Sequence, residues 1–482
     1  MKLIYEKSSP GRPGVQMTSI KISDSEEIPS RYLRAAPPEL PEVSEAEVVR
    51  HFTALSRLNY SIDTHFYPLG SCTMKYNPKA CEAAANLPEL MEVHPLWPQL
   101  WGGGMLTQGS LAILYRTERM LSEITGLDEF TLQPMAGAHG ELTGVMLMAA
   151  YHADQGNDQK DHIIVPDSAH GTNPASAMLA GYDVVTIPSD AKGMMDFDLF
   201  MKALNEKTAG VMLTCPNTLG VFNTRIREIC DAVHAVDGLM YYDGANFNAI
   251  MGRYKPGEIG FDICHLNLHK SFATPHGGGG PGAGPVGVVE KLRPYLPISR
   301  VKRRAEGTYV LHYDGPKSIG YIAPFYGNFG ILVRAYAYMV SLGKEGLLGT
   351  SNRAVLNANY LRERLRPLFG VEKAERCMHE FVFSGEFLKK HGIHVLDVAK
   401  GLIDRGFHPP TIYFPLNVPE AVMIEPTETE DLDTLDRFVE VMKELFELAE
   451  SNPDALHEAP ITTPVGRLDE VKAAKDMRLS CE

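Results

Sequence analysis

The stretch "HLNLHKSFATPHGGGGPG", residues 265–282, decides the fold of this chain. The apolar pattern of residues 263–268 predicts a buried strand, which ends in His269 and Lys270 and runs into four consecutive glycines. A lysine at the end of a buried strand, with apolar residues around it, is less strongly held in its charged form and can act as a nucleophile that forms a Schiff base. A single strand-end lysine more often extends to solvent, so Lys270 alone does not decide the chemistry.

The same pattern of short apolar segments recurs upstream and downstream of this strand. Helical patterns separate these short segments, which have strand character. The segments are 130–133, 163–165, 184–187, 211–214, 239–242 and 286–289. This alternation predicts an α/β fold with a mostly parallel sheet covered by helices on both faces. Ligands of such sheets bind beyond the carboxyl ends of the strands, where this sequence has five polar or glycine-containing loops.

A carboxylate follows the strand at 239–242. In "YYDGAN", Asp243 ends the strand, so we expect Asp243 and Lys270 to emerge at the same edge of the sheet. Pyridoxal phosphate requires an amine to hold it and a carboxylate that keeps its ring nitrogen protonated. Ala245 is small enough to lie flat under such a ring. Taken alone, a strand-terminal aspartate is usually a turn former or a helix cap.

An anion site is predicted at the start of an apolar helix. "PMAGAHGELTG" places Gly137, Ala138, His139 and Gly140 where free backbone N–H groups and the helix dipole favour a phosphate. A glycine-rich turn without a ligand explains the motif equally well. No Gly-Lys-Ser/Thr follows, which argues against a site for a nucleoside triphosphate.

A histidine follows the next strand. His170 in "DSAHGTN" is placed to stack on one face of a cofactor ring, while Thr172 and Asn173 donate hydrogen bonds. A histidine in this position is otherwise most often a capping or core residue.

Neither the histidines nor the cysteines indicate a metal or a disulfide framework. His265, His269 and His276 match no zinc pattern, and the strand that carries the first two is expected to bring neither a carboxylate nor a cysteine near them, so we predict no metal site. The seven cysteines are odd in number and form no C-x-x-C pair, which favours a reducing, cytoplasmic compartment.

The order of these signals along the chain is phosphate loop, histidine, a polar Pro-Asn turn ("CPNTLG", residues 215–220), aspartate and lysine. This order resembles the aspartate aminotransferase-like fold (fold type I) of pyridoxal-phosphate enzymes. Two long segments, "LNYSIDTHFYPLGSCTMKYNP" (58–78) and "NLHKSFATPHGGGGPGAGPVGV" (267–288), resemble the P-protein of the glycine cleavage system, glycine dehydrogenase (decarboxylating). "QPMAGAHGE" and "DSAHGTNPASA" support the likeness, which covers most of the chain. The length of 482 residues fits the separate, lysine-bearing subunit 2 type.

The resemblance implies a role for each candidate residue. Lys270 would hold pyridoxal phosphate covalently, Asp243 would pair with its ring nitrogen and His170 would stack on its ring. The further cofactor contacts implied are His269, Gly137 and Ala138 at the phosphate and Thr218 on the O3′ side; Thr172 and Ala245 are added as cofactor contacts from their positions described above.

The resemblance also implies an activity and partners. Glycine would lose CO2, and its aminomethyl group would pass to the lipoyl arm of the H-protein. A subunit 1 without the lysine would complete a heterodimer or a dimer of heterodimers. The loop 59–75 is expected to form the wall that admits the lipoyl arm, or else to pack only against subunit 1. Two alternatives remain open: another fold-type-I enzyme, either an amino acid decarboxylase or an aminotransferase, and a non-catalytic scaffold subunit.

Three regions are predicted: an N-terminal arm and loop region (1–105), a large cofactor-binding domain (106–330) and a smaller C-terminal α/β domain (331–482). Ser44 and Glu47 form a capping-box pattern, and a helix is expected at 107–125 with Gly126 closing it. In the last region we expect helices at 331–342, 352–365, 395–405 and 431–450, and strands at 380–383 and 411–414.

Composition excludes several classes of function. The chain has 46 Lys plus Arg against 60 Asp plus Glu, a net charge of −14 that disfavours nucleic acid and anionic membrane surfaces as partners. Hydrophobic residues make up 44% and charged residues 22%, which is typical of a globular chain with a large core. The N-terminal residues lack a signal-peptide pattern, and no apolar stretch reaches the roughly 20 residues of a membrane-spanning helix.

Overall fold

The computed structural model describes residues 2–12, 14, 29–36, 38–94, 104–276, 282–323, 327–371 and 376–477. The chain forms two compact units, Met1–Ser61 and Ile62–Glu482. The predicted three-region division stays a prediction, and the four glycines 277–280 lie outside the described residues.

In the first unit the capping box is confirmed at the start of α1 (Glu45–Ser56). The Oγ of Ser44 accepts from the backbone N–H of Glu47, while Glu47 Oε2 accepts from the backbone N–H of Ser44 at 3.0 Å. Two short 3-10 helices, η1 (Tyr5–Lys7) and η2 (Ser30–Tyr32), precede it.

The second unit is built on a seven-stranded sheet with the order β1-β7-β6-β5-β4-β2-β3. Every strand predicted for this sheet is present, and all neighbours pair in parallel except those of β7, so the mostly parallel sheet is confirmed. The strands are β1 (Glu129–Thr131), β2 (His162–Pro166), β3 (Asp183–Ile187), β4 (Thr208–Thr214), β5 (Leu239–Gly244), β6 (Ile263–Leu266) and β7 (Val286–Val288).

Helices cover both faces of this sheet. Met240 and Tyr242 of β5 belong to one hydrophobic core and Leu239 and Tyr241 to another, because successive residues of a strand point to opposite faces. Gly144 lies on helix α5 (Gly137–Asp154), and a Cβ there would lie 2.2 Å from the ring of Tyr241. A glycine is therefore needed where α5 approaches β5. The covering helices are α4 (Gln108–Thr125), α5 (Gly137–Asp154), α6 (Thr172–Leu179), α7 (Phe197–Ala203) and α8 (Ile226–Ala235). The helix predicted at 107–125 is confirmed as α4, and Gly126 follows it with φ 72°.

The strand predicted to carry Lys270 ends earlier than expected. β6 stops at Leu266, and Lys270 lies on a separate helical turn, α10 (Leu268–Ser271). The residue facing Leu266 is Pro285, which accepts from the N–H of Leu266 but has no N–H of its own to continue the ladder. The prediction that 263–268 is one continuous strand was therefore wrong at its last two residues.

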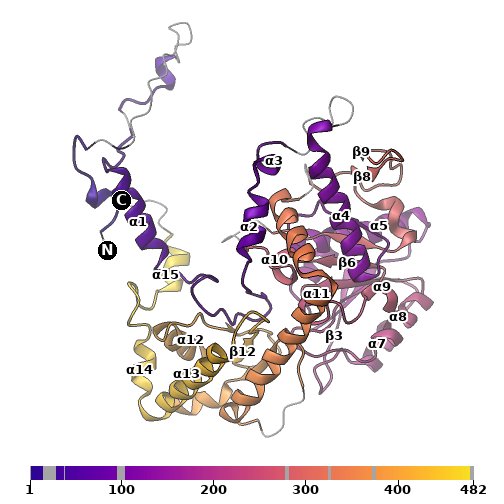
Figure 1. Ribbon diagram of the computed structural model, residues 1–482. Coiled ribbons are helices and arrows are strands. Elements are labelled where there is room, and N and C mark those ends of the chain that lie inside the picture. Colours follow the sequence, from indigo (N-terminus) through magenta and orange to yellow (C-terminus); the bar gives the residue numbers. More distant parts are fainter. Residues whose placement is uncertain are drawn as a thin grey trace. The chain divides into compact units, whose positions relative to one another are not determined.

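A long helix, α11 (Phe329–Leu365), links the sheet to the C-terminal part of this unit and packs on α2 (Lys79–Ala85), α4 and α13 (Leu432–Ser451) (Figure 1). Two separate helices were predicted here. Both are present, and they are separated by non-helical backbone at Gly343, whose φ of 60° suits a glycine.

The C-terminal sheet has the order β10-β12-β11 and is antiparallel. Its elements are β10 (Phe381–Ser384), α12 (Val395–Asp404), β11 (Thr411–Ile412), β12 (Ala421–Ile424), α13 (Leu432–Ser451), α14 (Pro453–Glu458) and α15 (Glu470–Lys475). The central strand β12 was not predicted, because four apolar residues between prolines and glutamates give no periodic signal.

The remaining described elements of the second unit are short. They are α2 (Lys79–Ala85), α3 (Pro88–Met91), η4 (Met105–Thr107), η5 (Phe247–Ala249), α9 (Pro256–Ile259), η6 (Glu290–Tyr295), β8 (Arg300–Arg303), β9 (Tyr309–His312), η7 (Arg366–Phe369) and η8 (Glu386–His391). Among the described residues, no helix combines the length and the apolar character needed to span a bilayer.

Candidate active site

A cavity of about 180 Å³ lies at the carboxyl edge of the large sheet. All nine residues predicted for the site line it: Gly137, Ala138, His170, Thr172, Thr218, Asp243, Ala245, His269 and Lys270. The lining also includes Ser71, Glu141, Thr214, Asn246, His265 and Asn267. The structure thus brings together what the sequence placed on five separate loops, while the role of each residue stays a prediction.

Asp243 is the fixed negative charge of this cavity. It is 1% exposed, and its Oδ2 accepts from Asn173 Nδ2 at 2.9 Å while its Oδ1 accepts from the N–H of Ala245 at 2.9 Å. Burial raises the pKa of Asp243, but His265 and these two hydrogen bonds more than offset it, so the pKa lies below its ordinary value. Asp243 is therefore a carboxylate that can pair with a protonated ring nitrogen.

Glu141 is a second carboxyl group in the cavity, and sequence reasoning did not include it. Its Oε1 accepts from Thr172 Oγ1 at 2.8 Å, and its buried Oε2 has no partner among the described residues. Burial and the negative charge of Asp243 raise the pKa of Glu141 to about 8, so it is mostly protonated at neutral pH. Its position one helical turn after Gly137 places both residues on one face of α5, which is the signal that could have found it.

His265 connects Asp243 to the helical turn that carries Lys270. The parallel register pairs Asp243 with His265, and His265 Nε2 lies 3.4 Å from Asp243 Oδ1. Nε2 also faces Asn267 Oδ1 at 3.0 Å, and Nδ1 faces the hydroxyl of Tyr241 at 2.7 Å. The expectation that no carboxylate lies near His265 was wrong, because it considered positions along one strand and not its neighbour.

The start of α5 has the features of an anion site. Its N-cap residue, Ala136, has no side-chain acceptor, so the first N–H groups of an 18-residue helix lack a side-chain cap. A Cβ on Gly137 would lie 2.2 Å from Asn267 Nδ2, so a larger residue here would displace the Asn267 side chain. The buried Nδ1 of His269 has no partner within the described ranges, and burial together with His276 and Lys270 lowers the pKa of His269 to about 3. His269 can therefore offer a phosphate a neutral N–H donor.

His170 and Thr218 line the cavity as predicted. His170 is exposed, and its Nδ1 lies 2.7 Å from Thr172 Oγ1, which orients the ring. The hydroxyl of Thr218 is buried and donates to the backbone carbonyl of Ser168 at 2.9 Å. Because that proton is engaged in the protein, Thr218 is free only as an acceptor toward a ligand.

Lys270 is half-buried, and within the described ranges its Nζ makes no hydrogen bond or ion pair. The apolar surroundings expected from the sequence are absent, because most of the side chains that line the cavity are polar. A free amine thus shares a polar cavity with one carboxylate and one protonated carboxyl group.

The loop 58–78 contributes one residue, Ser71, to the cavity lining. Two buried glutamates hold this part of the loop: Glu380 Oε2 accepts from the N–H of Ser71 at 2.7 Å, and Glu425 Oε2 accepts from the N–H of Thr73 at 2.8 Å. Ser71 and Thr73 have φ values of 65° and 49°, so these contacts hold left-handed backbone at the cavity.

This fold, with an amine and a buried carboxylate at the carboxyl edge of the sheet and an uncapped helix N-terminus beside them, defines a pyridoxal-phosphate-dependent enzyme of fold type I. The family model Aminotransferase class-V matches residues 142–280, and the model Glycine dehydrogenase, C-terminal domain matches residues 350–458.

Curated relatives match almost the whole chain. The "Probable glycine dehydrogenase (decarboxylating) subunit 2" of Caldanaerobacter subterraneus subsp. tengcongensis is 52% identical over 98% of this chain and 97% of its own. The protein of the same name from Halalkalibacterium halodurans is 52% identical over 98% of this chain and 96% of its own. The chain belongs to the family of glycine dehydrogenase (decarboxylating) subunit 2.

Solved structures agree on the fold. A glycine decarboxylase (P-protein) of the glycine cleavage system, in inhibitor-bound form, superposes with a TM-score of 0.71 at 21% identity and covers 87% of this chain and 93% of its own. A glutamate decarboxylase from Lactobacillus brevis superposes with a TM-score of 0.65 at 12% identity over 88% of this chain and 97% of its own.

Proposed function

We propose that this chain is the lysine-bearing subunit of a glycine-cleaving P-protein. It decarboxylates glycine, releases CO2 and transfers the remaining aminomethyl group to the lipoyl arm of the H-protein. The observation that carries the proposal is that the free amine of Lys270 and the ionised carboxylate of Asp243 line the same cavity in a chain from this family.

The residues present fit pyridoxal phosphate. The N–H groups of Gly137 and Ala138 and the neutral His269 would hold its phosphate, and Asp243 would hold a proton on its ring nitrogen. When bound, the cofactor supplies the electron sink for the electron pair that CO2 leaves behind. His170 would cover the ring face at the open side of the cavity, and Nζ of Lys270 would hold the cofactor and move a proton between substrate and solvent.

The charges around the cavity favour a decarboxylase. Among the described residues no arginine lines it, so no bidentate clamp stabilises the substrate carboxylate before CO2 leaves. An interaction that stabilises the ground state more than the transition state would slow this step. An aminotransferase must instead retain the carboxylate, so the missing clamp supports decarboxylation over transamination.

A second subunit is part of the proposal. The relatives carry the name subunit 2, which supports a partner, subunit 1, in a heterodimer or a dimer of heterodimers. The loop 59–75 contributes Ser71 to the cavity, which supports its assignment as the wall that admits the lipoyl arm. A reducing, cytoplasmic location completes the proposal, supported by six cysteines that are free in the described part of the chain.

The test is glycine-dependent exchange of labelled CO2 by the chain with subunit 1, with and without lipoylated H-protein. We expect exchange that requires lipoylated H-protein, and a borohydride-reduced pyridoxyl label on the peptide that contains Lys270. Asp243→Asn should keep most of the cofactor content and lose about 10² or more in rate, because the electron sink weakens. Transamination of a keto acid, or no label on Lys270, would overturn the proposal.

A further inference from the structure

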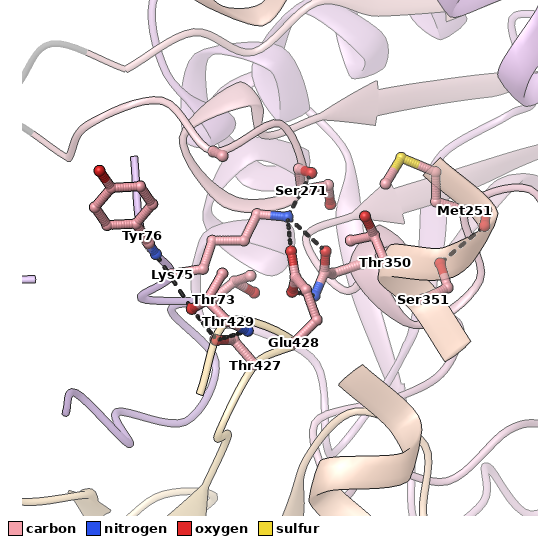
Figure 2. Close-up of polar contacts among 12 residues, drawn as sticks. Thr73, Lys75, Tyr76, Met251, Ser271, Thr350, Ser351, Thr427, Glu428 and Thr429 are labelled. Carbon is pink, nitrogen blue, oxygen red and sulfur yellow. Dashed lines mark hydrogen bonds and ion pairs between the residues drawn. The ribbon is translucent and has the colours of Figure 1, made fainter. Parts of the chain in front are cut away.

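Lys75 is a second lysine of the same region, and it is fully enclosed. It is 2% exposed, and its Nζ donates to the backbone carbonyl of Ser271 at 2.8 Å, to Asn248 Oδ1 at 2.9 Å and to Glu428 Oε1 at 2.9 Å (Figure 2). A longer contact of 3.3 Å reaches the hydroxyl of Tyr338. All hydrogens of this ammonium group are therefore used, and none is available to a ligand.

The contact with Ser271 ties Lys75 to the segment that carries Lys270. Ser271 is the last residue of the turn α10 and the next residue after Lys270, so its carbonyl lies at the negative end of that turn. Two residues after Lys75, Asn77 Nδ2 donates to the carbonyl of Ala273 at 3.0 Å. Ala273 has φ 53°, a conformation that a non-glycine residue keeps only when its surroundings hold it. The loop thus fixes two carbonyls immediately after Lys270.

The contacts with Glu428 and Asn248 link the same ammonium to two other segments. Glu428 Oε2 accepts from Asn248 Nδ2 at 3.2 Å, so the three side chains form a closed set. Asn248 lies on η5, five residues after Asp243 on the segment that leaves β5. Burial lowers the pKa of Lys75, but Glu428 and Tyr338 more than offset it, so the pKa is raised and the ammonium stays charged.

We propose that Lys75 is a positioning residue for Lys270. By joining the carbonyl of Ser271 to the segment after Asp243, it fixes the distance between the amine and the carboxylate of the cavity. The inference rests on the role proposed above for Lys270. Without the Nζ of Lys75, α10 loses its C-terminal contact and the amine of Lys270 samples positions away from the line to Asp243.

Two variants separate this role from simple stabilisation. Lys75→Met removes the contact with Ser271 and also leaves the carboxylate of Glu428 buried without its partner. The double variant Lys75→Met with Glu428→Gln removes the contact but leaves no unpaired charge. Lys160→Met is the matched control, because Lys160 is also buried and donates to two backbone carbonyls, those of Thr208 and Val236, which lie away from the cavity.

The first measurement is hydrogen exchange of residues 268–274 in the cofactor-free protein. We expect exchange about tenfold or more faster in the double variant than in the wild type, and unchanged in Lys160→Met. The second is the pH titration of the visible absorbance of the bound cofactor. We expect the midpoint of this titration to shift by about one pH unit in the double variant. The third is kinetic: kcat should fall about 10- to 100-fold with KM for glycine nearly constant, and Lys75→Arg should recover part of the loss.

Wild-type exchange in 268–274 together with a wild-type titration in the double variant would overturn the inference and leave Lys75 a purely structural residue. Failure of the proposed function has a different signature. The wild type itself would then lack the label on Lys270 or the CO2 exchange, while hydrogen exchange would still report on the contact between Lys75 and α10. If Lys75→Met does not fold, the double variant and Lys75→Arg still supply these measurements.

Discussion

Lys270 and Lys75 are two lysines in opposite settings, and Lys75 contacts the residue that follows Lys270. Lys270 is half-buried and lines the cavity, and its Nζ makes no hydrogen bond within the described ranges. The Nζ of Lys75 is buried and donates to a carboxylate, an amide oxygen and the carbonyl next to Lys270. A lysine whose donors are all engaged contributes to structure, whereas a lysine without partners is free to react, so the number of partners separates the two roles better than burial does.

The largest expected effect comes from removing the free amine. Lys270→Met should reduce glycine-dependent CO2 exchange by more than about 10³-fold, because no other described lysine lines the cavity to hold the cofactor. The free energy of unfolding should change by less than about 1 kcal/mol, since no described hydrogen bond to Nζ is lost. Urea unfolding of the cofactor-free protein checks the second part. A large loss of stability would contradict the contrast with Lys75.

In contrast to Lys270→Met, Lys75→Met should lower the free energy of unfolding strongly. Removing one partner of a buried ion pair leaves Glu428 charged in a buried site, which costs about 3–5 kcal/mol. Adding Glu428→Gln should recover at least half of that loss, because no unpaired charge then remains. Urea unfolding of the cofactor-free single and double variants measures both values. Equal losses in the two variants would show that packing, and not the unpaired carboxylate, sets the cost.

The two lysines also show what could be predicted from the sequence. Lys270, Asp243 and His170 were found because each follows a short apolar strand, and parallel strands end at one edge of a sheet. The partners of Lys75 come from chain positions that no local pattern connects, since Asn248, Ser271 and Glu428 follow it by 173, 196 and 353 positions. Register within the sheet explains the other misses, because His265 faces Asp243 only across neighbouring strands.

Local sequence patterns predicted the elements of the fold better than they predicted where each element ends. The seven strands of the large sheet were predicted because each is apolar and bounded by turn residues. The end of β6 was missed because the facing segment has Pro285 opposite Leu266, where no N–H can donate in return. The chain then turns into α10 while Leu268 still donates to the carbonyl of Ala283. The two helices predicted at 331–342 and 352–365 are present, and the non-helical residue between them is Gly343.

The carboxyl groups of the cavity extend the comparison, and the effect expected from them is a dependence of stability on pH. Asp243 accepts two hydrogen bonds beside His265 and is ionised, whereas Glu141 accepts one, leaves Oε2 unpaired and has a pKa raised to about 8. Between pH 4.5, the ordinary pKa, and about pH 8, the folded protein therefore holds the proton of Glu141 while the unfolded chain has released it. The contribution of Glu141 to stability is therefore complete below about pH 4.5 and is lost as the pH rises to about 8, with a slope of up to about 1.4 kcal/mol per pH unit.

Glu141→Gln removes this titration but keeps the shape of the side chain and an acceptor for Thr172. The free energy of unfolding of the cofactor-free variant should therefore fall less between pH 5 and pH 8 than that of the wild type. Urea unfolding at pH 5, 6, 7 and 8 measures the difference in slope, with Glu39→Gln, an exposed glutamate of the first unit, as the control that should leave the slope unchanged. Parallel pH profiles of wild type and Glu141→Gln would mean that Glu141 is ionised in the folded protein. Asp243 and Glu141 would then carry two negative charges in one cavity, and the rule that partner number decides the state of a buried group would fail for these carboxyl groups.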